Sequence, residues 1–222
     1  MTPTPRIALI HALRESLPPI WDAFAAGWPT AEYFNLLDDS LSVDREREGR
    51  LTPAIEHRFV ALGRYAAGVN DGGRKTRAVL FTCSAFGPAI DHVKRELDIP
   101  VLRPNEAAFE RALDMGPRIA VMVTFGPSLE SLTRELEGMS QRPVAIEGRL
   151  VEGALSALQS GDGATHDRLI ADAVNALPPV DAIVLGQFSM ARAAQSIAPA
   201  FRNRVLTTPD AAVAKLRALL AA

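Results

Sequence analysis

The chain has 222 residues, of which 48% are hydrophobic and 23% charged, and its formal net charge at pH 7 is −2. This length and apolar content are sufficient for one large globular domain or two smaller ones. The intermixed charges exclude the basic surface of a typical nucleic-acid-binding protein and an acidic tail.

The first half of the chain contains four short segments that are typical of strands, at residues 6–11, 32–37, 78–81 and 99–102. The segment 78–81 is apolar at every position. A strand that is buried on both faces of a parallel sheet has this composition. We therefore expect a parallel sheet in this half.

Helical patterns separate these strands. The apolar face of the first helix includes Ile20, Trp21 and Phe24. A second helix is expected at about residues 52–69, and a third begins at Pro88, a residue that suits the first helical turn. The charged run at 44–48 alternates in sign and is interpreted as a solvated segment before the second helix. The Asp-Gly-Gly sequence at 71–73 then breaks the pattern.

The second half of the chain repeats this order of elements. We expect strands at residues 118–124, 143–147, 181–186 and 204–207. A helix that opens at Gly126-Pro127 follows the first of them, and two more are expected at about residues 151–159 and 165–177. Each half therefore has a similar βαβ order.

Two such halves predict an α/β protein with two pseudo-symmetric lobes, each a short parallel sheet flanked by helices. We expect residues 1–102 plus 208–222 to form the first lobe and residues 103–207 to form the second. The active site is expected in the cleft between them.

The only cysteine, Cys83, follows the segment 78–81 and precedes the helix that begins at Pro88. It is thus predicted at the carboxyl end of a strand and the amino end of a helix, where open α/β sheets bind ligands. The same environment is expected to lower the pKa of a thiol, which suits an acid/base catalyst. The alternative is an inert, buried cysteine. A single cysteine also excludes an internal disulfide and favours a reducing compartment.

Four stretches of the chain resemble motifs of the aspartate/glutamate/hydantoin racemase superfamily, which includes maleate isomerase and arylmalonate decarboxylase. These are Leu80-Phe-Thr-Cys-Ser-Ala-Phe86, Ile99-Pro-Val-Leu-Arg-Pro-Asn-Glu106, Val123-Thr-Phe125 and Val184-Leu-Gly-Gln-Phe-Ser-Met190. The resemblance covers nearly the whole chain. It implies two α/β lobes with one catalytic cysteine each, on opposite faces of the substrate, and proton transfer beside a carboxylate or imide without a cofactor.

The sequence departs from the family pattern at Gln187. Cys83 matches the first catalytic cysteine, but Gln187 stands where the second is expected, and a glutamine side chain exchanges no proton at neutral pH. The resemblance implies a racemase-like isomerase that works through Cys83. A single-cysteine decarboxylase or lyase of the arylmalonate decarboxylase type and a non-catalytic protein that binds small acids are the alternatives. A serine hydrolase is disfavoured because the Gly-x-Ser-x-Gly frame is absent around Ser189.

Proton abstraction beside a carboxylate builds negative charge on the substrate oxygens, which requires hydrogen-bond donors. We expect the backbone N–H groups of Ser84 and Ala85, and the hydroxyls of Ser84, Thr124 and Ser189, to supply them. Each hydroxyl is equally a candidate helix N-cap. The remaining residues expected to bind substrate are Phe125, Gln187, Phe188 and His11.

The expected partner is a small carboxylate-bearing substrate, and a homo-oligomer is a further possibility. We expect no nucleic acid and no membrane, because no apolar run approaches the ~20 residues of a membrane helix. The N-terminus lacks the long apolar core of a signal peptide, which predicts a cytoplasmic location. No cofactor is expected, and no metal, because the chain has no His-Glu-x-x-His spacing.

Overall fold

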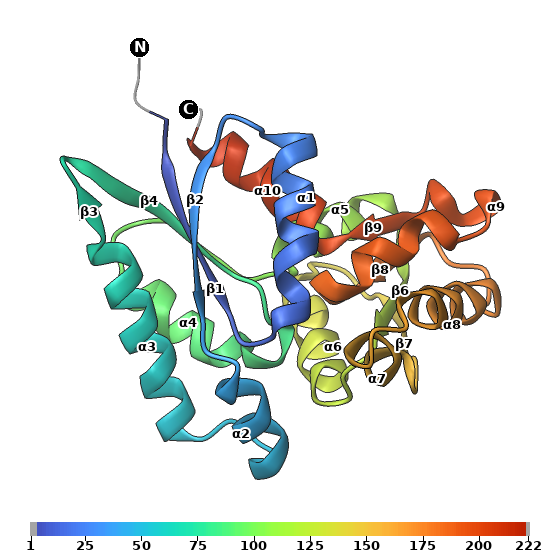
Figure 1. The fold of residues 1–222 in the computed structure, drawn as a ribbon. Coiled ribbons are helices and arrows are strands. Elements are labelled where there is room, and N and C mark those ends of the chain that lie inside the picture. Colours follow the sequence, from blue (N-terminus) through green and yellow to red (C-terminus); the bar gives the residue numbers. More distant parts are fainter. Residues whose placement is uncertain (1–3, 221–222) are drawn as a thin grey trace.

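Two mainly parallel sheets, one from each half of the chain, form the framework of the protein (Figure 1). The computed structural model describes residues 4–220, apart from the side chain of Asp71. Helices flank both sheets. The expected α/β fold with two lobes of similar topology is therefore confirmed.

In the first sheet, β1 (Arg6–His11) lies between β2 (Glu32–Leu37) and β4 (Arg74–Phe81) and is parallel to both. On its other side β4 pairs in parallel with β5 (Val101–Leu102). The apolar run of β4 is buried from Ala78 to Phe81, as its composition predicts.

The second sheet has the same strand order. β6 (Arg118–Val123) lies between β7 (Ala145–Leu150) and β8 (Ala182–Leu185), and β8 pairs with β9 (Val205–Thr207). All of these pairs are parallel. Because β4 and β8 hold equivalent places in the two sheets, the residues that follow them are equivalent as well.

The helices and short 3-10 turns (η) connect these strands. Those of the first half are η1 (Arg14–Ser16), α1 (Leu17–Gly27), α2 (Ser40–Glu48), α3 (Pro53–Gly68), η2 (Ser84–Phe86) and α4 (Gly87–Glu96). Those of the second half are α5 (Glu106–Met115), α6 (Pro127–Met139), α7 (Ala154–Gln159), α8 (Gly163–Asn175), η3 (Phe188–Ser196), α9 (Pro199–Arg202) and α10 (Thr208–Leu220).

Apolar side chains from α3 and α4 cover one face of the first sheet. Phe59 of α3 stacks on Phe81 of β4 with ring centroids 5.2 Å apart, and Ile90 of α4 belongs to the same cluster. Full burial of a side chain such as Phe59 contributes about 1.5–3 kcal/mol. This layer therefore anchors the strand that leads to Cys83.

The opposite face of the first sheet packs against α1 and the C-terminal helix α10. Leu9 and Leu80 lie in one cluster with Phe24 of α1 and Val213 of α10. Helix α10 also contacts α5 of the second half. The assignment of residues 208–222 to the first lobe agrees with the contact to α1 but not with the contact to α5, so it stays a prediction. Residues 221–222 lie outside the described part of the chain.

The structure adds detail to two local expectations. The charged run at 44–48 is exposed, as expected, but it belongs to helix α2, whose only buried residue is Leu41. The Asp-Gly-Gly break at 71–73 is the turn of a hairpin in which β3 (Asn70–Asp71) pairs antiparallel with β4. Gly72 and Gly73 have φ values of 57° and 93°, which glycine adopts without strain.

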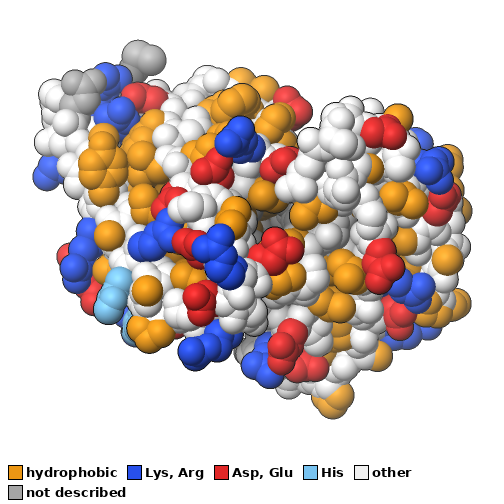
Figure 2. All heavy atoms as spheres, turned by 60° about the horizontal axis from the view of Figure 1, so that its bottom comes forward, with side chains coloured by type: hydrophobic (Ala, Val, Ile, Leu, Met, Phe, Trp, Pro, Cys, Tyr) orange, Lys and Arg blue, Asp and Glu red, His pale blue; other side chains and the backbone are white. Residues whose placement is uncertain are grey.

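Figure 2 shows the molecule turned so that the lower side of Figure 1 faces the reader. Acidic and basic side chains are intermixed over this surface. Within residues 4–220, every helix is too short or too polar to cross a bilayer.

Candidate functional site

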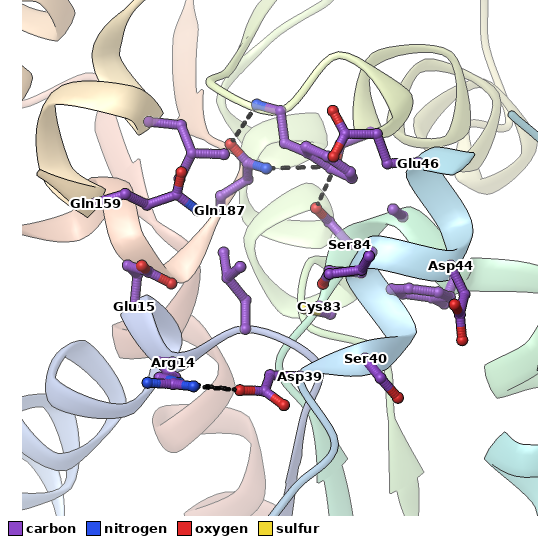
Figure 3. Close-up of a pocket in the computed structure, with 18 of the residues that line it drawn as sticks. Arg14, Glu15, Asp39, Ser40, Asp44, Glu46, Cys83, Ser84, Gln159 and Gln187 are labelled. Carbon is purple, nitrogen blue, oxygen red and sulfur yellow. Dashed lines mark hydrogen bonds and ion pairs between the residues drawn. The ribbon is translucent and has the colours of Figure 1, made fainter. Parts of the chain in front are cut away.

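A cavity of about 710 Å³ lies between the two lobes (Figure 3). Its first-half lining is formed by Leu13, Arg14, Glu15, Asp39, Ser40, Ser42, Val43, Asp44, Glu46, Arg47, Cys83, Ser84, Ala85 and Phe86. Its second-half lining is formed by Phe125, Ser128, Leu155, Gln159 and Gln187. The predicted cleft is therefore present, with the ends of β4 and β8 on its wall.

Cys83 lies in this wall, two residues beyond the end of β4. The strand is held to its neighbour up to this point, since the N–H of Thr82 donates to the carbonyl of Ile10 at 3.0 Å. After Cys83 the chain turns into η2 and then α4. The residue is partly exposed and has no disulfide partner. The placement of Cys83 at a strand end beside a helix start is confirmed.

The environment of Cys83 changes its pKa in the direction opposite to our expectation. Burial raises the pKa of the thiol to about 11, although the backbone of Ala12 and the side chains of Ser16 and Ser42 oppose this shift. Nearby Glu15 raises the pKa further. At neutral pH the sulfur therefore carries its proton, and the expectation of a lowered pKa was wrong because desolvation outweighs the donors.

Gln187 holds the equivalent place beyond β8. Its Oε1 accepts hydrogen bonds from the N–H of Thr124 at 2.6 Å, the hydroxyl of Thr124 at 2.8 Å and the N–H of Phe125 at 3.2 Å. Gly186 permits this approach, because a Cβ there would lie 2.9 Å from the carbonyl of Met122. The Gln187 side chain thus ties the end of β8 to the end of β6.

A serine pair joins the two lobes at the cavity. The hydroxyl of Ser84 donates to Oγ of Ser128 on α6 at 3.0 Å, and Nε2 of Gln187 donates to the same oxygen at 3.3 Å. The hydroxyls of Ser84 and Thr124, expected to hold substrate oxygens, therefore already donate within the protein. The backbone N–H groups of Ser84 and Ala85 lie in the first turn of a helix, where no helical partner exists.

His11 ends β1 but does not line the cavity. It is fully buried, with Nδ1 2.8 Å from the hydroxyl of Thr82 and Nε2 3.0 Å from Oδ1 of Asn35. Burial lowers its pKa to about 4, although the hydrogen bond to Asn35 acts in the opposite direction. This geometry corrects the expectation of a substrate contact, because both ring nitrogens are already engaged.

Phe188 and Ser189 also lie away from the cavity lining. Phe188 is 1% exposed and packs in the first-lobe cluster with Leu9 and Leu80, so it seals the contact between the lobes. Ser189 is buried in η3. Of the residues expected to bind substrate, Ser84, Ala85, Phe125 and Gln187 line the cavity, whereas Thr124 reaches it through Gln187.

Sequence reasoning missed the residues that close the cavity from α2 and α7. Ser42, Val43 and Arg47 come from α2, whereas Leu155 and Gln159 come from α7. Both helices follow outer strands of the sheets, β2 and β7. Because the segments after parallel strands gather at one edge of a sheet, this rule identifies them as candidate lining.

A partly buried ion-pair network lies at the seam of the lobes. Arg103 Nε donates to Asp91 Oδ1 of α4 at 2.9 Å, and its Nη1 lies 3.3 Å from Glu135 Oε2 of α6. Burial raises the pKa of Glu135 to about 7, although the charge of Arg103 opposes this shift. The Glu135 carboxyl therefore titrates near neutrality.

Among residues 4–220, the structure has no group of three or more His, Cys, Asp or Glu side chains placed to hold a metal ion. The cavity presents one thiol, several acids and bases at its mouth, and apolar side chains such as Phe125 and Leu155. Such a site is equipped for acid/base chemistry.

Comparison with known proteins agrees with this architecture. The glutamate racemase of Bacillus anthracis is 14% identical with a TM-score of 0.72, over 98% of this chain and 82% of that one. The allantoin racemase of Klebsiella pneumoniae is 22% identical with a TM-score of 0.69, over 98% and 88%. A glycine-to-cysteine mutant of arylmalonate decarboxylase, with sulfate ion associated, is 19% identical with a TM-score of 0.64, over 96% and 94%. These structures show the shared fold.

Sequence comparison with curated proteins finds no match. The model of the Asp/Glu/Hydantoin racemase family, however, matches residues 55–216, which include both Cys83 and Gln187. The resemblance noted from four short motifs is thereby confirmed, and the chain belongs to the Asp/Glu/hydantoin racemase family.

Proposed function

We propose that the protein is a cofactor-independent enzyme that transfers a proton at the carbon next to a carboxylate or imide, with Cys83 as its only thiol acid/base. The observation that carries this proposal is the position of Cys83, partly exposed in the wall of the cavity between the lobes. A sulfur sealed in the core would support no such role. The family supports the reaction class and leaves the substrate open.

In the proposed mechanism a C–H or C–CO₂⁻ bond of the substrate breaks and leaves its electron pair on the carbon, and the protonated Cys83 then acts as an acid. The S–H bond breaks, its proton forms a new C–H bond on the carbanion-like carbon, and the resulting thiolate regains a proton from solvent. The backbone N–H groups of Ser84 and Ala85 are proposed to donate to the substrate oxygens that carry the negative charge. One such donor typically contributes about 3 kcal/mol to the transition state.

A racemase-like isomerase would use the same sulfur to remove the proton as well. This direction requires the thiolate, which a pKa of about 11 disfavours at neutral pH. It also requires a proton carrier on the opposite face, where the Gln187 amide is hydrogen-bonded and cannot exchange a proton.

The second candidate is therefore a decarboxylase or lyase that protonates a carbanion on one face. Two features favour it, the raised pKa of Cys83 and the hydrogen-bonded amide of Gln187. Arylmalonate decarboxylase, one of the structural neighbours, carries this activity in its name. In this reaction, loss of carbon dioxide creates the carbanion, and no base is needed.

The test is turnover in deuterium oxide with glutamate, aspartate, allantoin and phenylmalonate as probes. An isomerase incorporates deuterium at the α-carbon of an unchanged substrate, whereas a decarboxylase releases carbon dioxide and leaves one labelled enantiomer. A Cys83→Ser variant is expected to lose about 10²- to 10⁴-fold in rate, the usual contribution of a positioned acid or base.

The Ser84→Ala variant is a matched control, since it keeps the thiol and the backbone donors. Full turnover by Cys83→Ser would refute the role of the sulfur. Thermal stabilisation by the probes without exchange or carbon dioxide release would indicate a protein that only binds small acids.

A further inference from the structure

The side chain of Gln187 occupies a set of three hydrogen-bond donors in the second lobe. The N–H groups of Thr124 and Phe125 and the hydroxyl of Thr124 all point at its Oε1, at 2.6 to 3.2 Å. A neutral amide oxygen has two lone pairs. Three converging donors are instead the arrangement that stabilises an anionic oxygen. The protein thus fills an oxyanion site with its own side chain.

Other contacts hold Gln187 in this position. Its Nε2 donates to Oγ of Ser128, which is fully buried and also accepts from Ser84 (Figure 3). The preceding Gly186 lies so close to β6 that a Cβ would be 2.9 Å from the carbonyl oxygen of Met122. The backbone of Gly186 is therefore packed against β6, and the side chain of Gln187 is bound at both ends of its amide.

We infer that Gln187 is an intramolecular plug which restricts the enzyme to substrates with a single acid group. The acid lies on the Cys83 side of the cavity, and the second lobe receives an uncharged substituent. The second-half lining agrees, since Phe125 and Leu155 are apolar and Gln159 is neutral. This inference rests on the proposed proton transfer at Cys83, because it assigns the substrate of the same site. It is incompatible with phenylmalonate as the substrate of the second candidate, because a malonate carries two acid groups.

A purely structural tie between β6 and β8 is the competing explanation of these hydrogen bonds. Removal of a structural tie changes stability and leaves anion binding unchanged. Removal of a plug frees the three donors that Gln187 Oε1 now occupies, so a second carboxylate gains a binding partner. The two explanations therefore differ in ligand affinity.

The experiment measures calorimetric binding of phenylacetate and phenylmalonate, which differ by one carboxylate. The wild type is expected to bind phenylacetate at least as tightly as phenylmalonate. The Gln187→Ala variant is expected to bind phenylmalonate about tenfold more tightly than the wild type does, because hydrogen bonds to a charged group are strong. Its affinity for phenylacetate is expected to change less than about threefold.

Gln187→Glu is the matched control. Its side chain keeps an oxygen against the same donors and is expected to show no gain for phenylmalonate. Gln187→Ser serves as a second opened variant if Gln187→Ala does not fold. In the wild type, the amide NMR signals of Thr124 and Phe125 are expected to stay unchanged on addition of phenylacetate.

The inference is overturned if neither opened variant binds phenylmalonate more tightly than the wild type, including the case of no measurable binding. It is also overturned if the wild type prefers phenylmalonate about tenfold over phenylacetate. These binding ratios do not depend on turnover. A fully active Cys83→Ser variant would therefore refute the proposed function without changing the binding result that tests the role of Gln187.

Discussion

The ends of β4 and β8 are equivalent positions in two sheets of the same topology, yet they carry different chemistry. Beyond β4, Cys83 faces the cavity as a protonated thiol. Beyond β8, Gln187 is bound by three donors from the end of β6. The comparison teaches that a duplicated backbone supplies a place for a side chain, whereas the side chain and its partners decide whether a proton can move there.

The lobes also differ in how their buried ionisable groups respond to pH. Burial lowers the pKa of His11 in the first lobe and raises that of Glu135 in the second. Each shift disfavours the charged form of its group. As pH rises from about 4.5 to 6.5, the contribution of His11 to folding stability therefore increases and that of Glu135 decreases.

The first prediction concerns Glu135. Its folded pKa of about 7 lies above the ordinary 4.5, so the folded state binds the proton more tightly and stability falls as pH rises from 4.5 to 7. Glu135→Gln removes a penalty of roughly 3 kcal/mol at pH 8 and none at pH 4.5. Urea unfolding at both pH values measures the difference, and an equal effect at both would contradict the raised pKa.

The second prediction concerns His11. Its folded pKa of about 4 lies below the ordinary 6.5, so the stability that it contributes is present above pH 6.5 and is lost as pH falls toward 4. The loss in the wild type amounts to roughly 3 kcal/mol. His11→Asn is expected to remove this slope, whatever it costs in packing. His57→Asn, at an exposed position, is the control, because it removes a histidine and leaves the buried His11 ring in place.

The third prediction concerns the reactivity of Cys83. With a pKa of about 11, only about a thousandth of the thiol is ionised at pH 8. Alkylation by iodoacetamide is therefore expected to be about a hundredfold slower in the folded protein than in urea, and to accelerate toward pH 11. A folded thiol that reacts as fast as the unfolded one at pH 8 would disprove the protonated state.

The smallest expected effect concerns the stability that Gln187 provides. Gln187→Leu leaves the donors of Thr124 and Phe125 without an acceptor and is expected to cost roughly 2 kcal/mol. Gln187→Glu keeps an acceptor and should cost less. The equivalent change in the first lobe, Cys83→Ala, is expected to cost about 1 kcal/mol, because it removes only weak bonds to sulfur. Equal losses of unfolding free energy for Gln187→Leu and Cys83→Ala would contradict this difference between the lobes.

The two-lobed architecture and the position of Cys83 could be predicted from local sequence patterns. Continuous apolar runs such as 78–81 and the residue types that start helices are local signals, and the second half repeated them in the same order. The charged run at 44–48 gave no apolar stripe, so its helix could not be recognised from local pattern.

The chemistry of the site, in contrast, follows from contacts between residues that are distant in the sequence. The pKa of Cys83, the burial of His11 and the three bonds to Gln187 depend on residues far apart in the chain, such as Thr124 and Gln187. Desolvation and hydrogen-bond satisfaction are properties of a residue's surroundings in space. The position of Cys83 at a strand end can therefore be predicted from the sequence, whereas its protonation state cannot.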